Sequence, residues 1–434
     1  MVSGGNGPQE DENRGERLSD EQLLDLVQES TFQYFWDGAE PVSGLSCERI
    51  HLDDVYPSND RDVVTSGGTG FGLMAILVAI EREFVTREEA VLRLSKMMES
   101  LKKADRFHGV WPHWLHGPTG KVKPFSRKDD GGDLVETSFL AQGLICVRQY
   151  FRNGNAAERK LASEADELWR DIEWDWHRGP SRENVLYWHW SPKHQWEMDF
   201  RIRGYNECLI TYVLAASSPT HGVPAEVYHE GWAERGQIRK TTASHGVTLQ
   251  LKHQGIKSQC APLFWAHYSF LGLDPRGLSD RYGNYWQHNQ AHVQMCLNYC
   301  IENPAGHKGY SKSCWGLTSS YSPKGYRGHC PQRDEGTIAP TAALSSFPYN
   351  PVACMAALRY FHDELGDRLL GKYGFYDAFN QSENWFPTRY LAIDQGPIVI
   401  MIEDHRSGLL WNLFMSAPEV QAGLEKLNFV TTRR

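Results

Sequence analysis

The chain has 434 residues, with 45 basic and 54 acidic side chains and a formal net charge of −9 at pH 7. It has no Lys/Arg-rich run and no stretch near the roughly 20 apolar residues that span a bilayer, so we expect no nucleic-acid partner and no transmembrane segment. A chain of this length can form several small domains or one large barrel.

The first 18 residues differ from the rest of the chain in composition. The start, "MVSGGNGPQEDENRGE", is rich in Gly and charge and lacks the apolar segment of a signal peptide. We therefore predict a disordered tether over 1–18 and a single catalytic domain over 19–430. Nine scattered cysteines indicate neither a disulfide framework nor a compartment.

Charged amphipathic helices recur along the chain. The first, over 19–36, begins with Ser19 and Gln22 at capping-box spacing, and the second, over 86–104, begins with Thr86 and Glu89. Similar patterns follow over 155–175, 224–238, 284–302 and 416–429.

Between these helices lie segments almost free of charge. A helix that is apolar on all sides must be buried on all sides. Six half-exposed helices that alternate with six buried ones predict an all-α fold, the (α/α)6 barrel, with an inner ring inside an outer ring. One irregularity is that no clear outer helix appears between 361 and 394. The buried segments are 68–80, 137–147, 208–216, 260–272, 351–361 and 396–402.

Loop length gives the barrel a direction. Connections from buried to exposed helices are short, whereas those that lead into buried helices are long, and long loops in compact domains are usually functional. Because every loop that enters an inner helix lies on the same rim, we predict the site on that rim. The long loops are 37–67, 105–132, 177–202, 239–259 and 303–350.

Aromatic residues gather in these loops. The chain has 15 Trp, 19 Tyr and 18 Phe, and core packing accounts for many of them. Packing alone does not explain aromatics in surface loops, where flat rings suit the C–H faces of sugars. The loop set is Trp111, Trp114, Trp188, Trp190, Trp196, Trp315 and Trp385, with Tyr321 and Tyr326.

Acidic residues recur where the uncharged segments begin. They are the cluster at 129–136, Glu207, Asp334 with Glu335, and Asp394. An acidic residue in a first helical turn commonly caps the backbone, and Asp133 with Glu136 has capping-box spacing. Capping and catalysis are compatible here, because the N-termini of inner helices point at the predicted site.

Glycoside hydrolysis needs one protonated carboxyl to donate to the leaving oxygen and one ionised carboxylate to activate water or attack the sugar. Glu207 has apolar neighbours that would raise its pKa, which favours the acid role, and a helix start keeps a carboxylate ionised. We therefore predict Glu207 as the acid and a rim aspartate as the base.

Other chemistries have weaker support. Cys296, Cys300, Cys314, His329 and Cys330 lack tight zinc spacing, so we predict no metal. The "GGTGFG" at 67–72 has no preceding strand, which argues against a dinucleotide site, so its glycines allow close helix packing or close approach to ligand. We expect no cofactor.

Several long segments together resemble one known family. They are "SGGTGFGLMAI", "GGDLVETSFLAQGLI", "YNECLITYVLA", "DEGTIAPTAALSSFPYNP" and "YLAIDQGPIVIMIEDHRSGLLW". In this order, between about residues 20 and 430, they resemble the glycoamylase-like family, glycoside hydrolase family 144. The "RDEGTIAP" loop departs from the family's single Asp-Gly pair, which leaves open whether Asp334 or Glu335 faces the substrate.

The resemblance implies an (α/α)6 barrel that inverts configuration without a metal as it cleaves β-1,2-glucan, either internally or by release of sophorose. It also implies an envelope, periplasmic or secreted location, with any signal sequence absent from this chain. The partner is then an oligo- or polysaccharide, and we expect a monomer. The catalytic candidates implied are Asp129, Asp133, Glu136, Glu207 and Asp394. The substrate-binding candidates are Trp111, His113, Trp188, Arg203, Tyr326, Glu335 and Trp385.

Three alternatives stay open. A non-catalytic glycan-binding protein on the same scaffold would keep the tryptophans without needing the acids. Transglycosylation is possible because related domains occur in cyclic glucan synthases. An α/α-barrel polysaccharide lyase would need a basic cleft, for which Arg201, Arg203 and Arg327 are the candidates.

Overall fold

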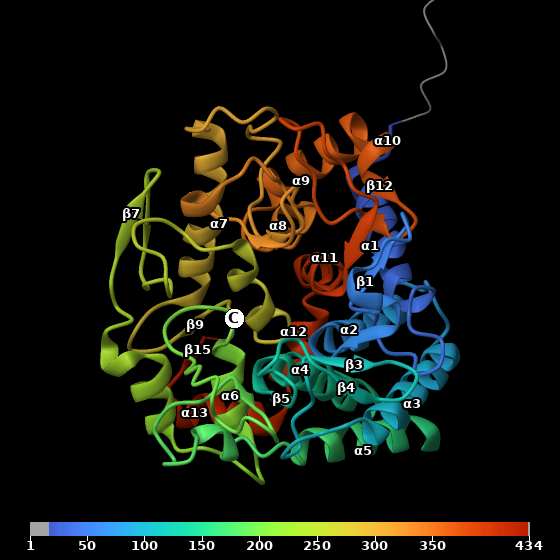
Figure 1. Ribbon diagram of the computed structural model, residues 1–434, viewed down its shortest axis with the longest axis vertical. Coiled ribbons are helices and arrows are strands. Elements are labelled where there is room, and N and C mark those ends of the chain that lie inside the picture. Colours follow the sequence, from blue (N-terminus) through green and yellow to red (C-terminus); the bar gives the residue numbers. More distant parts are fainter. Residues whose placement is uncertain (1–16, 433–434) are drawn as a thin grey trace, which may run out of the picture.

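The computed structural model describes residues 17–432 and consists mainly of helices joined by loops (Figure 1). The predicted tether over 1–18 lies outside the described residues except for Arg17 and Leu18. Arg17 forms an ion pair with Asp363 at 3.0 Å. Among the described residues, no helix has the length and apolar character needed to cross a membrane.

Half-exposed helices form the outer ring. Both predicted capping boxes are confirmed: Ser19 and Gln22 cap the first outer helix reciprocally, and Thr86 and Glu89 cap the second. The predicted helix over 224–238 is instead a short π-helical segment followed by a 3-10 turn, in which Arg235 has a φ of 55°. The outer elements are α1 (Asp20–Trp36), α3 (Arg87–Lys103), α5 (Ala156–Arg170), η3 (Val227–Trp232), η4 (Glu234–Gly236), α7 (Tyr285–Glu302) and α9 (Pro351–Arg359).

Six buried elements form the inner ring, and the (α/α)6 barrel is confirmed in the described part of the chain. Their sequences are nearly free of charge because protein surrounds them on every side. They are α2 (Ser66–Glu81), α4 (Leu134–Phe151), α6 (Leu209–Ser217), the turns η5 (Leu263–Ala266) and η6 (Tyr268–Phe270), α8 (Pro340–Leu344), and α11 (Ala392–Arg406).

Two predicted inner helices were wrong. The 260–272 segment is buried but forms two short 3-10 turns, η5 and η6, with His267 between them, instead of one continuous helix. The 351–361 segment is the outer helix α9, on which Val352 is 81% exposed. The true inner helix is the five-residue α8, which was hidden in the predicted 303–350 loop. With this shift the missing outer helix between 361 and 394 is explained.

The chain continues after the last inner helix. The helix predicted over 416–429 is α13 (Pro418–Lys426), which packs against α6, and α12 (Leu409–Met415) lies between α11 and α13. The short α10 (Gly366–Leu369) and η8 (Tyr360–Glu364) follow α9.

Short antiparallel strands connect the loops that enter neighbouring inner helices. Strand β2 (Val63–Thr65), before α2, pairs with β3 (Trp114–His116), before α4. Strand β5 (Gly132–Asp133), before α4, pairs with β6 (His189–Trp190), before α6. Strand β1 (Arg49–His51), before α2, pairs with β14 (Arg389–Leu391), before α11. These pairings tie the long loops into one rim, as the loop lengths predicted.

Of the remaining strands, one extends the pair of β2 and β3, and the others form two-stranded sheets of their own. They are β4 (Lys121–Lys123) on β3, β7 (Thr242–Ser244) with β8 (Val247–Leu249), β9 (Leu278–Ser279) with β15 (Val430–Thr431), β10 (Ser319–Ser320) with β11 (Arg327–Gly328), and β12 (Leu370–Gly371) with β13 (Gly374–Phe375).

Two glycines let α2 and α4 touch backbone to backbone. A Cβ on Gly143 would lie 2.4 Å from the carbonyl oxygen of Gly70, and a Cβ on Gly70 would lie 2.3 Å from the carbonyl oxygen of Phe139. Gly143→Ala should therefore force the two helices apart and lower the free energy of unfolding by about 1–3 kcal/mol. Gly366→Ala is the control, since a Cβ there meets nothing within 4 Å. Equal denaturation midpoints for both variants would contradict this close approach.

Candidate active site

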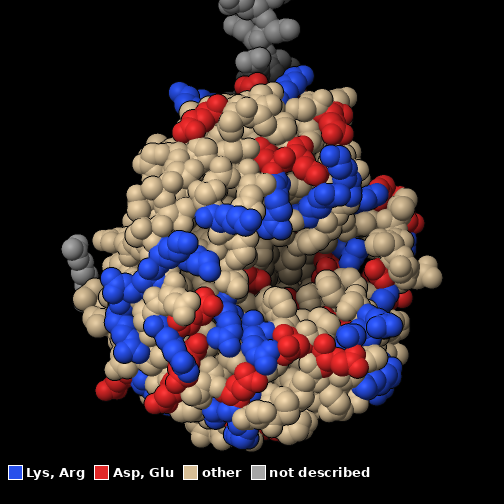
Figure 2. All heavy atoms as spheres, turned by 60° about the vertical axis from the view of Figure 1, so that its left-hand side comes forward, with Lys and Arg blue, Asp and Glu red and all other residues tan. Residues whose placement is uncertain are grey.

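A cavity of about 360 Å³ opens at the rim where α2, α4, α6 and α11 begin. Three carboxylates line it, Glu48, Glu136 and Glu207, each from a different loop or helix start. The surface in Figure 2 is hollowed near its middle, with acidic side chains inside the hollow. Aromatic side chains form much of the wall: Trp114, Phe125, Phe139, Trp188, Phe264, Tyr268, Tyr321 and Tyr326.

Glu207 lies in the turn just before α6, where the uncharged segment begins. Its backbone carbonyl accepts a hydrogen bond from the Ser269 hydroxyl, which holds this turn against the neighbouring inner element. Burial raises the pKa of the Glu207 carboxyl to about 7, and the negative charges of Glu136 and Asp133 act in the same direction. No cation contributes to this shift, so the cavity favours the protonated form.

Glu136 lies in the first turn of α4. Its Oε2 accepts hydrogen bonds from the Gly67 amide at 3.0 Å and the Thr65 hydroxyl at 3.4 Å. Its Oε1 is 3.9 Å from Nε2 of His113. Burial raises the pKa of Glu136 to about 7, against the opposing effect of the His113 charge. Gly67 must lack a side chain here, since a Cβ would lie 2.3 Å from Oε2.

Asp133 is the N-cap of α4 and is completely buried. Its Oδ1 accepts from the amides of Val135 and Glu136 at 3.0 and 2.9 Å. Its Oδ2 accepts from His113 Nδ1 at 3.0 Å and from the Trp188 indole N–H at 3.1 Å. The reciprocal half of the predicted capping box is absent, because the Glu136 side chain turns to Gly67. Asp133 therefore caps the helix and also orients two side chains of the cavity wall.

Two histidines contact Asp133, and one of them, His189, also contacts Asp129. His189 Nε2 lies 3.1 Å from Asp129 Oδ2 and 3.4 Å from Asp133 Oδ2. Burial lowers the pKa of both histidines, but the hydrogen bonds and charges of their acidic neighbours outweigh it, with pKa values of about 10 for His113 and about 9 for His189. The same bonds outweigh burial at Asp133 and hold its pKa well below the usual range. Both histidines are therefore cationic at neutral pH.

Asp394 is buried in the first turn of α11, next to Ile393, which lines the cavity. Burial raises its pKa, and the charge of the nearby Asp377 raises it further. Asp377 accepts the Tyr321 amide at 2.7 Å, and burial raises its pKa to about 6. The two acids thus form a buried pair behind the cavity wall, of which the sequence indicated only Asp394.

Three of the seven predicted substrate-binding residues line the cavity: His113, Trp188 and Tyr326. Trp111 does not fit that prediction, because it is fully buried in the core and its indole N–H donates to the Leu101 carbonyl at 3.2 Å. Arg203 lines a separate surface pocket and donates to the Glu230 carbonyl.

Glu335 and Trp385 also lie outside the cavity wall. Glu335 pairs with Arg327 at 3.2 Å and with Lys324 at 3.7 Å. The Trp385 backbone pairs with Asn380. Glu48 and Arg49 line the cavity but were missed, although their position in the long 37–67 loop could have indicated them.

One group of three potential metal-ligating side chains occurs within residues 17–432, formed by His113, Asp129 and Asp133. Their ligand atoms already serve the hydrogen bonds described above. The cysteines and His329 considered from the sequence do not form such a group in this part of the chain. All nine cysteines are buried and unpaired.

Two cavity carboxyls with raised pKa values, beside aromatic rings at the rim of an (α/α)6 barrel, are the arrangement that a glycoside hydrolase requires. Comparison with known proteins gives the family. The family model described as "Glycoamylase: Putative glucoamylase" matches residues 199–418. The chain belongs to this glycoamylase-like family, glycoside hydrolase family 144.

Three relatives illustrate the similarity. An endo-β-1,2-glucanase from Chitinophaga pinensis, solved with sophorotriose and glucose, is 59% identical over 96% of this chain and 99% of its own, with a TM-score of 0.94. The exo β-1,2-glucooligosaccharide sophorohydrolase (non-reducing end) of Parabacteroides distasonis is 44% identical over 95% of this chain, which spans 58% of that relative's length. The endo-β-1,2-glucanase of Talaromyces funiculosus, with 11% identity over 95% of this chain and 91% of its own and a TM-score of 0.70, shares the fold.

Proposed function

We propose that this chain hydrolyses β-1,2-glucan, either within the polymer or by release of sophorose. The observation that carries the proposal is the pair Glu136 and Glu207 in one aromatic-walled cavity. The relatives named for β-1,2-glucan or its oligosaccharides, at 44% and 59% identity, support the choice of linkage.

Glu207 is the proton donor in this proposal. Its raised pKa favours the protonated carboxyl near neutral pH, and no cationic side chain of residues 17–432 forms an ion pair with it. The proton passes to O2 of the departing glucose unit as the bond between C1 and that oxygen breaks.

Glu136 is the second carboxylate. His113, cationic and 3.9 Å from Oε1, favours the ionised form, whereas Glu207 has no such neighbour. Glu136 removes a proton from the water that attacks C1 from the opposite face, and the product sugar then has inverted configuration. The resemblance to the family supports inversion. Proton NMR tests it, because the signal of the first-formed anomer shows the configuration at C1 of the product.

The aromatic walls suit the sugar units on either side of the cleaved bond. Phe125 is 48% exposed and stacks on His113 with ring centroids 4.2 Å apart. Trp188, which lines the cavity, contacts edge-on the ring of Phe200 beside it, with ring centroids 5.2 Å apart. Flat rings at the cavity mouth can pack against C–H faces of glucose.

A time course on long β-1,2-glucan tests the proposal. We expect reducing sugar from β-1,2-glucan and none from starch. Starch is the matched alternative because the family model is described as a glucoamylase. Sophorose alone from the start means exo action, and a spread of lengths means endo action. Release from starch but not from β-1,2-glucan would refute the proposal, and products longer than the substrate would indicate transglycosylation.

The pH profile of kcat/KM should be bell-shaped around neutrality. Activity falls as pH rises through the Glu207 pKa of about 7, because the proton donor is lost. It falls on the acidic side as Glu136 is protonated. His113→Gln removes the charge that lowers the Glu136 pKa, so the acidic limb should move to higher pH. The basic limb should stay in place, since His113 does not contribute to the Glu207 shift.

The comparison variant for this experiment is His116→Gln, because His116 is a half-buried histidine of β3 outside the cavity wall, whose Nδ1 contacts Thr119. Both limbs should be unchanged in it. If His113→Gln shifted the basic limb and left the acidic one, the assignment of acid and base would have to be exchanged.

A further inference from the structure

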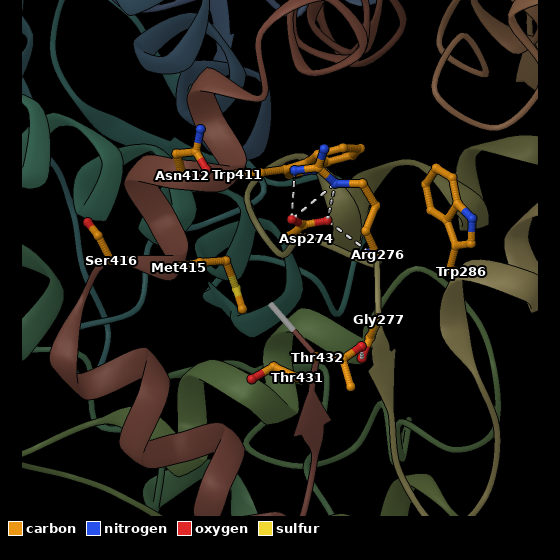
Figure 3. Close-up of a pocket in the computed structure, with 10 residues that line it drawn as sticks. All are labelled: Asp274, Arg276, Gly277, Trp286, Trp411, Asn412, Met415, Ser416, Thr431 and Thr432. Carbon is orange, nitrogen blue, oxygen red and sulfur yellow. Dashed lines mark hydrogen bonds and ion pairs between the residues drawn. The ribbon is translucent and has the colours of Figure 1, made fainter. Parts of the chain in front are cut away.

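A second and larger cavity, of about 770 Å³, lies away from the active site (Figure 3). We call it the far-rim pocket. Its wall comes from the loop after η6 with Asp274 and Arg276, from α12 with Trp411 and Asn412, and from Trp286 at the start of α7. Thr432, which directly follows strand β15, also lines the pocket. It shares no lining residue with the active-site cavity.

Chain topology places the far-rim pocket at the opposite end of the barrel. The active-site residues precede or open inner elements, whereas these segments follow the C-terminal ends of the inner elements η6 and α11. Trp286 opens an outer helix, and outer helices run opposite to inner ones. A ligand in the far-rim pocket would therefore leave the catalytic rim free.

The charges in the far-rim pocket cancel each other. Among the described residues 17–432, Asp274 and Arg276 are the charged side chains of its wall. The Arg276 guanidinium donates from Nε and Nη2 to both Asp274 oxygens at 2.9 to 3.2 Å, as the dashed lines in Figure 3 show. The guanidinium also stacks on the Trp411 ring, 4.5 Å from its centroid. A paired and stacked arginine offers little to an anion, so the pocket suits a neutral polar ligand.

The remaining wall combines an aromatic face with planar polar groups. Trp286 is partly exposed and lies across the pocket from the side chains of α12, among them Asn412 (Figure 3). An indole face packs on apolar C–H groups, while amide, carboxylate and guanidinium groups bond to hydroxyls. The volume is within the range of about 300–1,000 Å³ typical of ligand pockets. Sugars present hydroxyls and a C–H face together, which matches this wall.

We propose that the far-rim pocket is a second, non-catalytic binding site for a neutral oligosaccharide. Trp286 provides the stacking surface, and Asp274, Arg276 and Asn412 bind hydroxyls. The choice of β-1,2-linked glucose oligosaccharides as the probe rests on the proposed function. Bound there, one part of a long glucan holds the enzyme near the polymer while the catalytic rim remains open.

Calorimetric titration with sophorotriose tests this proposal. The full chain carries Glu207→Gln so that the probe is not cleaved during the measurement. We expect two binding sites per chain. Adding Trp286→Ala should weaken one of them about tenfold or more and leave the other unchanged.

The matched control is Trp36→Ala in the same background. Trp36, like Trp286, is a partly buried tryptophan of an outer helix, but it lies on α1 outside both cavities. Both sites should remain in this control. The proposal is overturned if only one binding site is found and Trp286→Ala leaves it intact. It is also overturned if sophorotriose does not bind at all. Cleavage of β-1,2-glucan by the unmodified chain is scored separately, so failure of the proposed function is recognised independently.

Discussion

Glu207→Gln should lower kcat on β-1,2-glucan by about 10³-fold, within the range of about 10²–10⁴ expected for loss of a general acid. Gln has the shape of protonated Glu but no acidic proton to donate to the leaving oxygen. Because the Glu207 carboxyl has a raised pKa through burial and no cationic partner, the neutral amide should fit without loss of stability. The measurements are steady-state kinetics on β-1,2-glucan and thermal denaturation of the variant.

A substrate that needs no acid distinguishes this role from a general loss of activity. Cleavage of dinitrophenyl β-sophoroside releases dinitrophenolate, a stable leaving group that needs no proton. Glu207→Gln should therefore regain most of its activity on this substrate, whereas Glu136→Gln should not. The control is Glu99→Gln on the exposed surface of α3, whose ion pair with Lys103 contributes little. Equal losses on both substrates would exclude Glu207 as the proton donor.

Much of the barrel could be predicted from the sequence because burial on all sides imposes a composition. An uncharged run of more than ten residues, such as α2, can be recognised as an inner helix, and capping residues indicate where outer helices begin. The five residues of α8 are too few for any periodic pattern, which is why Pro351–Arg359 was assigned to the wrong ring. Whether a buried aromatic run forms a helix or 3-10 turns depends on tertiary contacts such as His267 to Ser346.

The rim was predicted better than the individual side chains on it. Loop length places Asp133, Glu136 and Glu207 at one end of the barrel, but it does not say which atoms face the cavity. Trp111 and Trp188 are both loop tryptophans, yet one packs into the core and the other lines the cavity. The choice depends on strand pairings between distant loops, such as β5 with β6, which local sequence does not encode.

Asp133→Asn should have the largest effect on stability of any single change at the rim. The carboxylate accepts two backbone amides, the Trp188 indole N–H and His113, and it lies near His189, with no exposure to solvent. An amide has one accepting oxygen, so the cationic histidines lose a partner inside the protein. Removal of one partner from a buried ion pair costs about 3–5 kcal/mol, and chemical denaturation at neutral pH measures it.

The pH dependence of that loss has a sign that can be checked. The depressed Asp133 pKa contributes stability that is present above the unfolded value of 3.8 and disappears as pH falls further. The raised pKa values of His113 and His189 contribute stability that is complete below the unfolded value of 6.5 and is lost as pH rises through about 9 to 10. The difference in free energy of unfolding between the unmodified chain and Asp133→Asn should therefore be largest between about pH 3.8 and 6.5 and decrease on both sides.

Asp130→Asn is the matched control, because Asp130 is also buried in this loop but bonds to Ser191 and to the exposed Lys193. It should cost much less stability. Asp133→Asn should also lower the His113 pKa, which NMR titration follows, and displace Glu136, whose amide Asp133 caps. A stable Asp133→Asn protein with an unchanged His113 titration would show that the cap and the cationic pair are independent. The geometry argues against such independence, since one carboxylate group holds the start of α4 through Oδ1 and the His113 beside Glu136 through Oδ2.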